Sequence, residues 1–286
     1  MHKFWQQIGL GALTGLGVLL GSCGSEGQSN LDIVDGLQIP YTEEPAVVFL
    51  YNEGNNIRGG GVCTGTFIRP QVMITAAHCT DFVQSERGQG FNEETRDELT
   101  VLGWDPQLDD DDNPTNGISG NFFPLAKSAR IFRHPAVTRR TIKSVTPNDL
   151  AIVYFDDYRS SATKNLGVTA PRRNTRTTII GFGADSIQPS AGDDSVGKKR
   201  RGQVRVTRVG DFISFKGPKG TTCQRRCGEN SNAAPGDSGG PMVLGNEVVG
   251  VTSGGSIFES VYVNLNSRSS RAFISAVENE LGIALR

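Results

Sequence analysis

This sequence lacks an excess of charge of either sign, and it contains few histidines. Its 286 residues carry 29 basic and 30 acidic side chains, which gives a formal net charge of −1. A chain so close to neutral lacks the electrostatic means of capturing nucleic acid as its main activity. Apolar residues form 36% of the chain and charged residues 21%, which excludes a wholly disordered protein and a polytopic membrane protein. A folded body of one or two domains is therefore expected.

Apolar runs long enough to span a bilayer are missing as well. The run over residues 8–20 is too short for a permanent transmembrane helix and fits the core of a secretory signal peptide. The sequence Leu20-Gly21-Ser22-Cys23 follows and resembles the lipobox of bacterial lipoproteins, in which the peptidase cuts before the cysteine and the thiol is lipidated. The alternative is an ordinary signal peptide cut near Ser22, with Cys23 incidental.

We favour the lipoprotein interpretation, because a polar segment rich in Gly and Ser follows Cys23 and suits a tether. It gives a signal peptide over residues 1–22, a lipidated tether or propeptide over 23–32, and a folded domain over 33–286. The protein is then exported, either anchored in the cell envelope through the Cys23 lipid or secreted.

Cysteine is infrequent, with five residues in all. Lipidation of Cys23 leaves four, which are Cys63, Cys79, Cys223 and Cys227. Four thiols in an exported chain can form two disulfides, in any of three connectivities.

Short segments rich in β-branched residues dominate the body, and Gly, which often bounds them, numbers 36. They predict strands over residues 46–51, 62–68, 71–75, 99–104, 128–132, 150–155, 176–181, 203–209, 212–215, 241–244, 247–252 and 261–265. So many short strands with no helical pattern between them favour an all-β barrel or sandwich. One helix is expected at the C-terminus, where Phe273, Ile274, Val277 and Leu281 share a face.

Three long segments, over residues 81–98, 105–119 and 184–201, are predicted to be surface loops. The second contains the run from Asp109 to Asn113 (DDDDN), whose carboxylates repel one another unless a cation neutralises them. A calcium site and a solvated acidic loop are the alternatives, and we favour the loop because the spacing does not match an EF-hand. The third ends in residues 198–201 (KKRR), which we interpret as a solvated basic run that also suits proteolytic cleavage.

Histidine is limited to three residues, and only one of them is well placed for chemistry. His2 lies in the signal peptide, and His134 precedes a proline in a predicted turn. His78, in the motif TAAHC at the end of an apolar strand, is therefore the main candidate base near neutral pH. Taken alone, His78 is better explained as a structural histidine at a strand end.

Two further motifs carry candidate functional residues. Asp149, in NDLAIV, directly precedes a buried-type strand, where a carboxylate can hold an imidazole N–H in one tautomer. Alone, an Asp at such a position is more often a strand cap or a turn residue. Ser238, in PGDSGGP, lies between glycines that allow a tight turn with its N–H groups pointing the same way, as an oxyanion requires. A plain hairpin turn is the alternative, which the joint presence of all three motifs disfavours.

TAAHC, NDLAIV and GDSGGP, in this order, resemble the trypsin/chymotrypsin family of serine endopeptidases. The chain order His, Asp, Ser is that of this family and not of subtilisins or α/β-hydrolases. Three further segments agree with the family. They resemble the N-terminus freed from the zymogen, the GWG stretch and the wall of the specificity pocket, at residues 33–36 (IVDG), 181–183 (GFG) and 251–255 (VTSGG).

The resemblance implies an all-β fold of two six-stranded antiparallel β-barrels with a C-terminal helix and the site at the barrel interface. In it, Ser238 would be the nucleophile, His78 the general base and then acid, and Asp149 the residue that orients His78. Backbone N–H groups of Gly236 and Ser238 would form the oxyanion hole. The resemblance also implies a Cys63–Cys79 disulfide, and a Cys223–Cys227 bridge is suggested without a family counterpart.

The resemblance places four residues at the substrate pocket: Asn232, Ser253, Gly255 and Ser260. Asn232 stands where trypsin-like members carry an Asp that selects Arg and Lys. Ser260 stands where a Gly is usual and narrows the pocket. We therefore expect a preference for medium-sized polar or apolar side chains.

Activation is expected to follow the family's zymogen scheme. Cleavage between Asp32 and Ile33 would free the Ile33 α-amino group to pair with Asp237, next to the nucleophile. The bond follows an Asp, so self-cleavage by a trypsin-like cut is not expected. The same cut would release the enzyme from a lipid on Cys23.

The function expected from the sequence is that of a secreted or envelope-anchored serine endopeptidase acting on proteins or peptides. Two alternatives stay open: a proteolytically inactive binding module, and an acyl hydrolase such as an esterase. Nothing in the sequence indicates an organic cofactor, a zinc site or a dedicated oligomer interface, so a monomer without a cofactor is expected.

Overall fold

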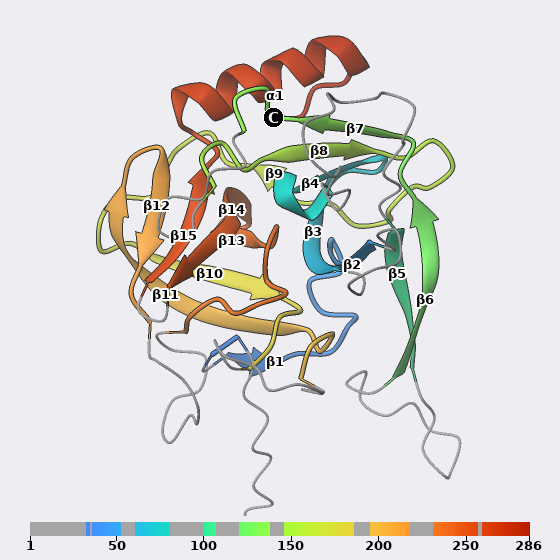
Figure 1. Ribbon diagram of the computed structural model, residues 1–286, viewed down its shortest axis with the longest axis horizontal. Coiled ribbons are helices and arrows are strands. Elements are labelled where there is room, and N and C mark those ends of the chain that lie inside the picture. The colour runs from blue at the N-terminus through green and yellow to red at the C-terminus, as the bar shows by residue number, and fades with distance from the viewer. Residues whose placement is uncertain are drawn as a thin grey trace, which may run out of the picture.

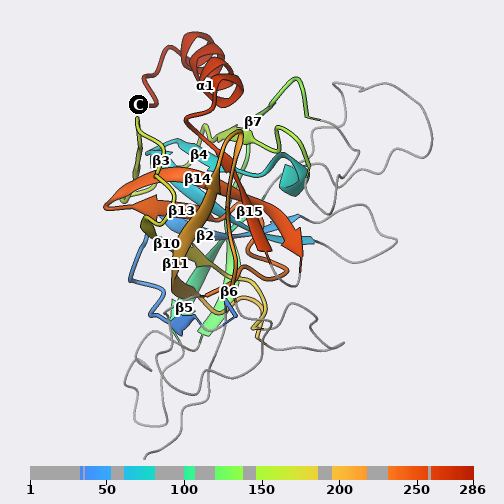
Figure 2. The ribbon, with the colours of Figure 1, turned by 90° about the vertical axis from the view of Figure 1, so that its left-hand side faces the viewer.

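In the part of the chain that the structure describes, two β-sheets hold nearly all of the regular structure, and one α-helix follows them (Figures 1 and 2). The computed structural model describes residues 33–34, 36–52, 61–80, 100–106, 120–137, 146–185, 195–217, 231–256 and 259–286. Within these residues the protein is mostly β with a C-terminal helix, which confirms the predicted fold class.

The first sheet has seven strands in the order β6-β5-β2-β3-β4-β8-β7. Their bounds are β2 (Val47–Asn52), β3 (Gly61–Arg69), β4 (Val72–Thr75), β5 (Thr100–Pro106), β6 (Gly120–Lys127), β7 (Arg130–Arg133) and β8 (Ala151–Tyr154). All the pairings are antiparallel. Strand β4 is fully buried between β3 and β8, so this part of the sheet lies in the apolar core of the first half.

The second sheet closes into a six-stranded barrel, because β11 pairs with both β10 and β12 and completes the ring β11-β10-β13-β14-β15-β12. Its strands are β10 (Arg176–Gly181), β11 (Arg200–Val209), β12 (Phe212–Phe215), β13 (Pro241–Leu244), β14 (Glu247–Ser256) and β15 (Glu259–Asn264). Two short strands, β1 (Leu37–Gln38) and β9 (Asn165–Leu166), pair with β11 and β14 from outside this ring.

The C-terminal helix α1 (Arg268–Leu281) is defined by caps at both ends. Ser267 accepts a hydrogen bond from the Ser270 amide, and Gly282 adopts the left-handed conformation, with φ of 65°. Phe273, Ile274 and Val277 are buried and belong to the same apolar core as β4 and β8. The helix therefore covers one end of the first sheet, as Figure 1 shows.

Each predicted strand has a counterpart in the structure, but the basic run does not behave as predicted. Residues 198–201 lead into β11, with Lys199 only 2% exposed and Arg200 completely buried. The interpretation as a solvated, cleavable run is therefore wrong. Strand β11 begins three residues before the predicted one, and its alternation turns Arg200, Gly202 and Val204 inward.

Several sequence predictions fall outside the described residues. These are the signal peptide, Cys23, the acidic run from Asp109 to Asn113, and both Cys223 and Cys227. None of the helices in the described part of the chain combines the length and apolarity that crossing a membrane requires.

Candidate active site

The register between β4 and β8 brings His78 and Asp149 together. Thr75 at the end of β4 lies opposite Ala151 at the start of β8. The residues after β4 and before β8 therefore meet at the same end of this strand pair. His78 lies in the 3-10 turn η1 (Ala77–Thr80), and its Nδ1 is 2.6 Å from Asp149 Oδ2.

Asp149 is completely buried and receives three hydrogen bonds. The His78 amide donates to Oδ1 at 2.9 Å, and the Ser253 hydroxyl donates to Oδ2 at 2.8 Å, besides the contact from the imidazole. A carboxylate held by several donors is fixed in orientation. It therefore keeps the proton of His78 on Nδ1 and leaves Nε2 as a hydrogen-bond acceptor.

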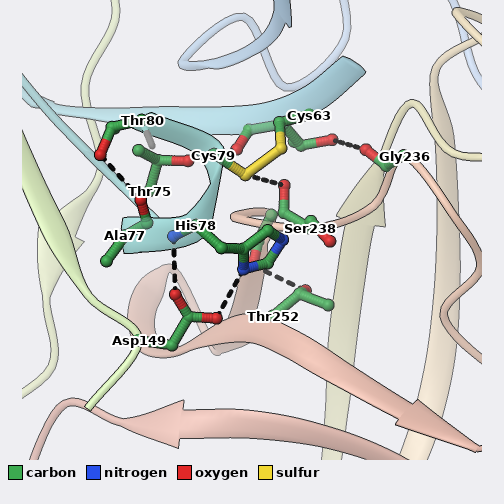
Figure 3. The surroundings of a disulfide bond; sticks show 12 residues. Cys63, Thr75, Ala77, His78, Cys79, Thr80, Asp149, Gly236, Ser238 and Thr252 are labelled. Atoms are coloured by element: carbon green, nitrogen blue, oxygen red, sulfur yellow. Dashed lines mark hydrogen bonds and ion pairs between the residues drawn. A yellow bond between two sulfur atoms is a disulfide. The ribbon is translucent and has the colours of Figure 1, made fainter. Parts of the chain in front are cut away.

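Ser238 comes from the second half of the chain and is fixed against the first. Its carbonyl accepts a hydrogen bond from the Thr64 amide at 2.8 Å and lies 3.5 Å from Cys79 Sγ. Figure 3 shows the His78 ring between the Asp149 carboxylate and Ser238. The structure thus gathers all three candidate residues where the two halves of the protein meet.

The turn that carries Ser238 is built on glycines with positive φ. Gly239 has φ of +82°, and a Cβ on it would lie 2.1 Å from Thr75 Oγ1 and 2.3 Å from the Thr64 carbonyl. The turn is therefore pressed directly onto strands β3 and β4. Only a residue without a side chain allows so close an approach.

The amides of Gly236 and Ser238 donate no hydrogen bond within the described part of the chain. Gly236 has φ of +101°, and its carbonyl is held by the Thr64 hydroxyl at 3.0 Å. The two N–H groups are thus available to a ligand beside the Ser238 side chain. This is the local geometry that an oxyanion requires.

Asp237, between these two amides, is 2% exposed, and its carboxylate points into the protein. Oδ1 accepts from the Gly183 amide and Oδ2 from the Ala234 amide, both at 2.8 Å. Burial raises the pKa of Asp237 to about 6, and these two hydrogen bonds and the Arg200 guanidinium oppose the rise.

Ile33 packs into the apolar core of the second barrel, and Val34 forms a β-bridge with Asn232. Ile33 is 1% exposed, and the Val34 carbonyl accepts from the Asn232 amide at 3.0 Å. Ile33 has φ of 47°, which is a strained conformation for a β-branched residue. The structure therefore places Ile33 beside the segment that carries Asn232.

Three of the four predicted pocket residues, Asn232, Gly255 and Ser260, are connected to one another, whereas the Ser253 hydroxyl bonds to Asp149. The Ser260 hydroxyl contacts both Asn232 Oδ1 and the Ala233 amide, and Asn232 is completely buried. Gly255 is paired with Ser260 across β14 and β15. A cavity of about 540 Å³ adjoins this region. It is lined by Pro147, Arg208, Val209, Gly210, Asp211, Phe212, Ser214, Gly255, Ser256, Glu259 and Val261.

Cys63 and Cys79 form a disulfide, which confirms that pairing. Their sulfur atoms and His78 lie close enough together to hold a metal ion, and no other such group was found among the described residues. Because both sulfurs are bonded to each other, they offer no thiolate ligands, and the donor set does not fit a metal.

Two contributions to the site were missed by reasoning from the sequence. Ser253 was placed in the pocket, yet its hydroxyl also fixes Asp149, from which it is separated by 104 positions. Thr64, in β3, holds the Ser238 turn through both its amide and its hydroxyl. No local motif marks either residue, because both contacts form only when the two halves of the chain pack together.

A closed β-barrel, a second sheet and a Ser–His–Asp constellation between them define a chymotrypsin-like architecture. The family model for trypsin matches residues 33–266. Because the match covers more than half of the sequence, this chain belongs to the trypsin family of serine peptidases, which are hydrolases of proteins and peptides.

Proposed function

We propose that the protein is a serine endopeptidase that hydrolyses peptide bonds through Ser238, His78 and Asp149. The observation that carries this proposal is the His78–Asp149 pair at 2.6 Å, with Ser238 on the other side of the imidazole (Figure 3). The order and geometry match the roles of nucleophile, base and orienting carboxylate.

In this mechanism, Ser238 Oγ attacks the scissile carbonyl carbon while His78 Nε2 accepts its proton. The amides of Gly236 and Ser238 stabilise the resulting oxyanion. His78 then protonates the leaving amine, and the acyl group stays on Ser238. Water, deprotonated by His78, hydrolyses the acyl-enzyme and restores the free serine. Asp149 stabilises the imidazolium in both halves of the reaction.

The substrate chain is proposed to add to the edge of β14. Pairing of β14 with β13 ends at Val251, whereas its pairing with β15 continues to Ser256. The backbone of residues 253–255 therefore extends past β13, where an extended peptide can form strand-like hydrogen bonds. The cavity that Gly255 helps to line lies next to this edge and offers room for substrate side chains.

The side chain before the scissile bond is proposed to enter a neutral pocket based on Asn232 and narrowed by Ser260. Neither residue supplies the negative charge that selects Arg and Lys. A medium-sized polar or apolar side chain is therefore the proposed preference.

Cleavage before Ile33 is proposed to produce the mature enzyme. Two observations support it: Ile33 is buried like an inserted terminus, and its positive φ costs energy only while the bond to Asp32 is intact. Export with lipidation at Cys23 is proposed alongside it, so that the same cut releases the enzyme. Intact-mass measurement of active protein is expected to show Ile33 as the first residue. Undiminished activity in protein that begins at Cys23 would contradict the activation scheme.

A fluorophosphonate probe tests the proposed function directly, because it reacts only with an activated serine. Wild-type protein cut before Ile33 is expected to be labelled at Ser238, and the Ser238→Ala and His78→Ala variants are not. Absence of labelling in the cut wild-type protein would instead support an inactive binding module.

A further inference from the structure

Arg200 and Asp237 are two buried groups of opposite charge, each bonded to the backbone of Gly183, and the proposed mechanism does not use Arg200. Arg200 is completely buried and Asp237 is 2% exposed. Gly183 joins them, because Arg200 Nη1 donates to its carbonyl at 3.0 Å and its amide donates to Asp237 Oδ1 at 2.8 Å. The Arg200 guanidinium thus holds the carbonyl of Gly183, and the Asp237 carboxylate holds its amide.

Gly183 also touches the turn that carries the oxyanion amides. A Cβ on Gly183 would lie 2.6 Å from Asp237 Cγ, and a Cβ on Gly236 would lie 2.8 Å from the Gly183 Cα. The backbone of Gly183 is therefore in direct contact with Asp237 and Gly236. Any shift of Gly183 must move the turn, because close-packed interiors transmit small displacements.

The charge of Asp237 needs a partner, because this carboxylate is buried. A buried carboxylate is costly to ionise unless a cation or hydrogen bonds compensate it. In the described part of the chain, the charged or titratable groups that act on Asp237 are Arg200 from β11 and, as a neutral phenol, Tyr262 from β15. Arg200 is the cation of this set.

The residue before Arg200 fastens the segment that follows Ile33. Lys199 Nζ donates to the carbonyls of Tyr41, Glu43 and Glu44 at 3.1, 2.9 and 2.9 Å. At the start of β11, Lys199 therefore holds the segment that follows Ile33, and the adjacent Arg200 holds Gly183. None of these contacts involves the Ile33 α-amino group, so none of them requires the chain to be cut before Ile33.

We propose that Arg200 is a built-in counterion of Asp237 that orders the oxyanion hole before the chain is cut. Cleavage ahead of Ile33 then raises the activity of a site that already exists. This inference rests on the proposed function. Arg200 is a positioning residue, since it acts through Gly183 and Asp237 and does not contact the reacting atoms.

The test compares the same folded protein before and after cutting. A recognition sequence for a site-specific protease is placed directly before Ile33 in the full chain, and fluorophosphonate labelling rates are measured on both forms. The variants are Arg200→Met, Arg200→Lys and the control Arg201→Met, whose native side chain lies on the same strand and pairs with Glu43. Thermal unfolding shows whether each variant folds.

The labelling rate of the uncut wild-type protein is expected to be lower than that of the cut protein by no more than about 100-fold. Arg200→Met is expected to lower the uncut rate by a further factor of about 10²–10³, the usual effect of losing an oxyanion donor. In the cut form its effect shrinks to about 10-fold, because the Ile33 ammonium supplies a second cation. Arg200→Lys restores most of the rate, and Arg201→Met changes it by less than about 2-fold.

Labelling of the cut wild-type protein with none in the uncut form would overturn the inference without needing a variant. Equal losses in Arg200→Met and Arg201→Met would also overturn it, as would equal losses for Arg200→Met in both forms. Absence of labelling in both wild-type forms would overturn the proposed function and the inference together.

Discussion

At the scale of single residues, the site depends on how firmly Asp149 is held. Its three donors come from the amide and ring of His78 and from the hydroxyl of Ser253. The motifs identified His78, Asp149 and Ser238 as candidates, because each of them lies in a short, recognisable segment of the sequence. They did not predict the Ser253 contact, since it joins residues that only the packing of the two halves brings together.

Replacing Ser253 by Ala should lower kcat/KM by about 10-fold to 100-fold, because one hydrogen bond to a buried charge is lost. Ser160→Ala is the matched control, since its hydroxyl is also buried but bonds to the Ala162 carbonyl. Steady-state kinetics on one peptide substrate measures both. Equal activity of Ser253→Ala and wild type would show that this hydroxyl does not position Asp149.

Lys199 predicts a pH dependence of stability. Burial lowers its pKa to about 7, from 10.5 for an exposed lysine, although Glu44 and Glu43 oppose the shift. Between pH 7 and 10.5, Lys199 binds more protons in the unfolded chain than in the folded one. The contribution of Lys199 to the free energy of unfolding therefore rises with pH. The contribution is complete above 10.5 and is lost as the pH falls through 7.

Lys199→Met should remove this pH dependence, while Lys198→Met should keep it. The Tm of each variant, measured from pH 6.5 to 10.5, is compared with that of wild type. A difference between Lys199→Met and wild type that stays constant with pH would contradict the assignment.

At the scale of elements, alternation and turn residues predicted most of the fold. Strand β6 was missed, because Pro124 interrupts it and a proline cannot donate to a strand ladder; the strand forms by pairing with β5. The start of β11 was missed because four consecutive cations usually indicate solvent. Period-two alternation extended back from Val204 would have placed Arg200 inside, but its burial depends on partners that are distant in the sequence.

The turn that carries Ser238 gives a prediction at the same scale. Gly239→Ala should destabilise the protein by about 3 kcal/mol or more, because a Cβ meets backbone and side chain from β3 and β4. Gly245→Ala is the control. It also has positive φ, 64°, but its Cβ would meet nothing within 4 Å, so about 1 kcal/mol is expected. Urea unfolding measures the difference, and equal costs would mean that the turn does not press on the first sheet.

At the scale of the whole molecule, neither half of the protein holds a complete site. His78 and Asp149 come from the first sheet, whereas Ser238 and the amide of Gly236 come from the closed barrel. The contacts of Thr64 and Gly239 across this junction are what join them. Reasoning from the sequence reached this arrangement only through the family resemblance, because spacing along the chain does not specify how two sheets dock.

The most direct test of the central claim is whether Ser238 and His78 act as one unit in peptide hydrolysis. The kcat/KM of a cleaved peptide is measured for wild type, Ser238→Ala, His78→Ala and the double variant. Residues that act together are strongly non-additive, so the double variant should lose no more activity than Ser238→Ala alone. Hydrolysis that persists undiminished in Ser238→Ala would contradict the proposed function.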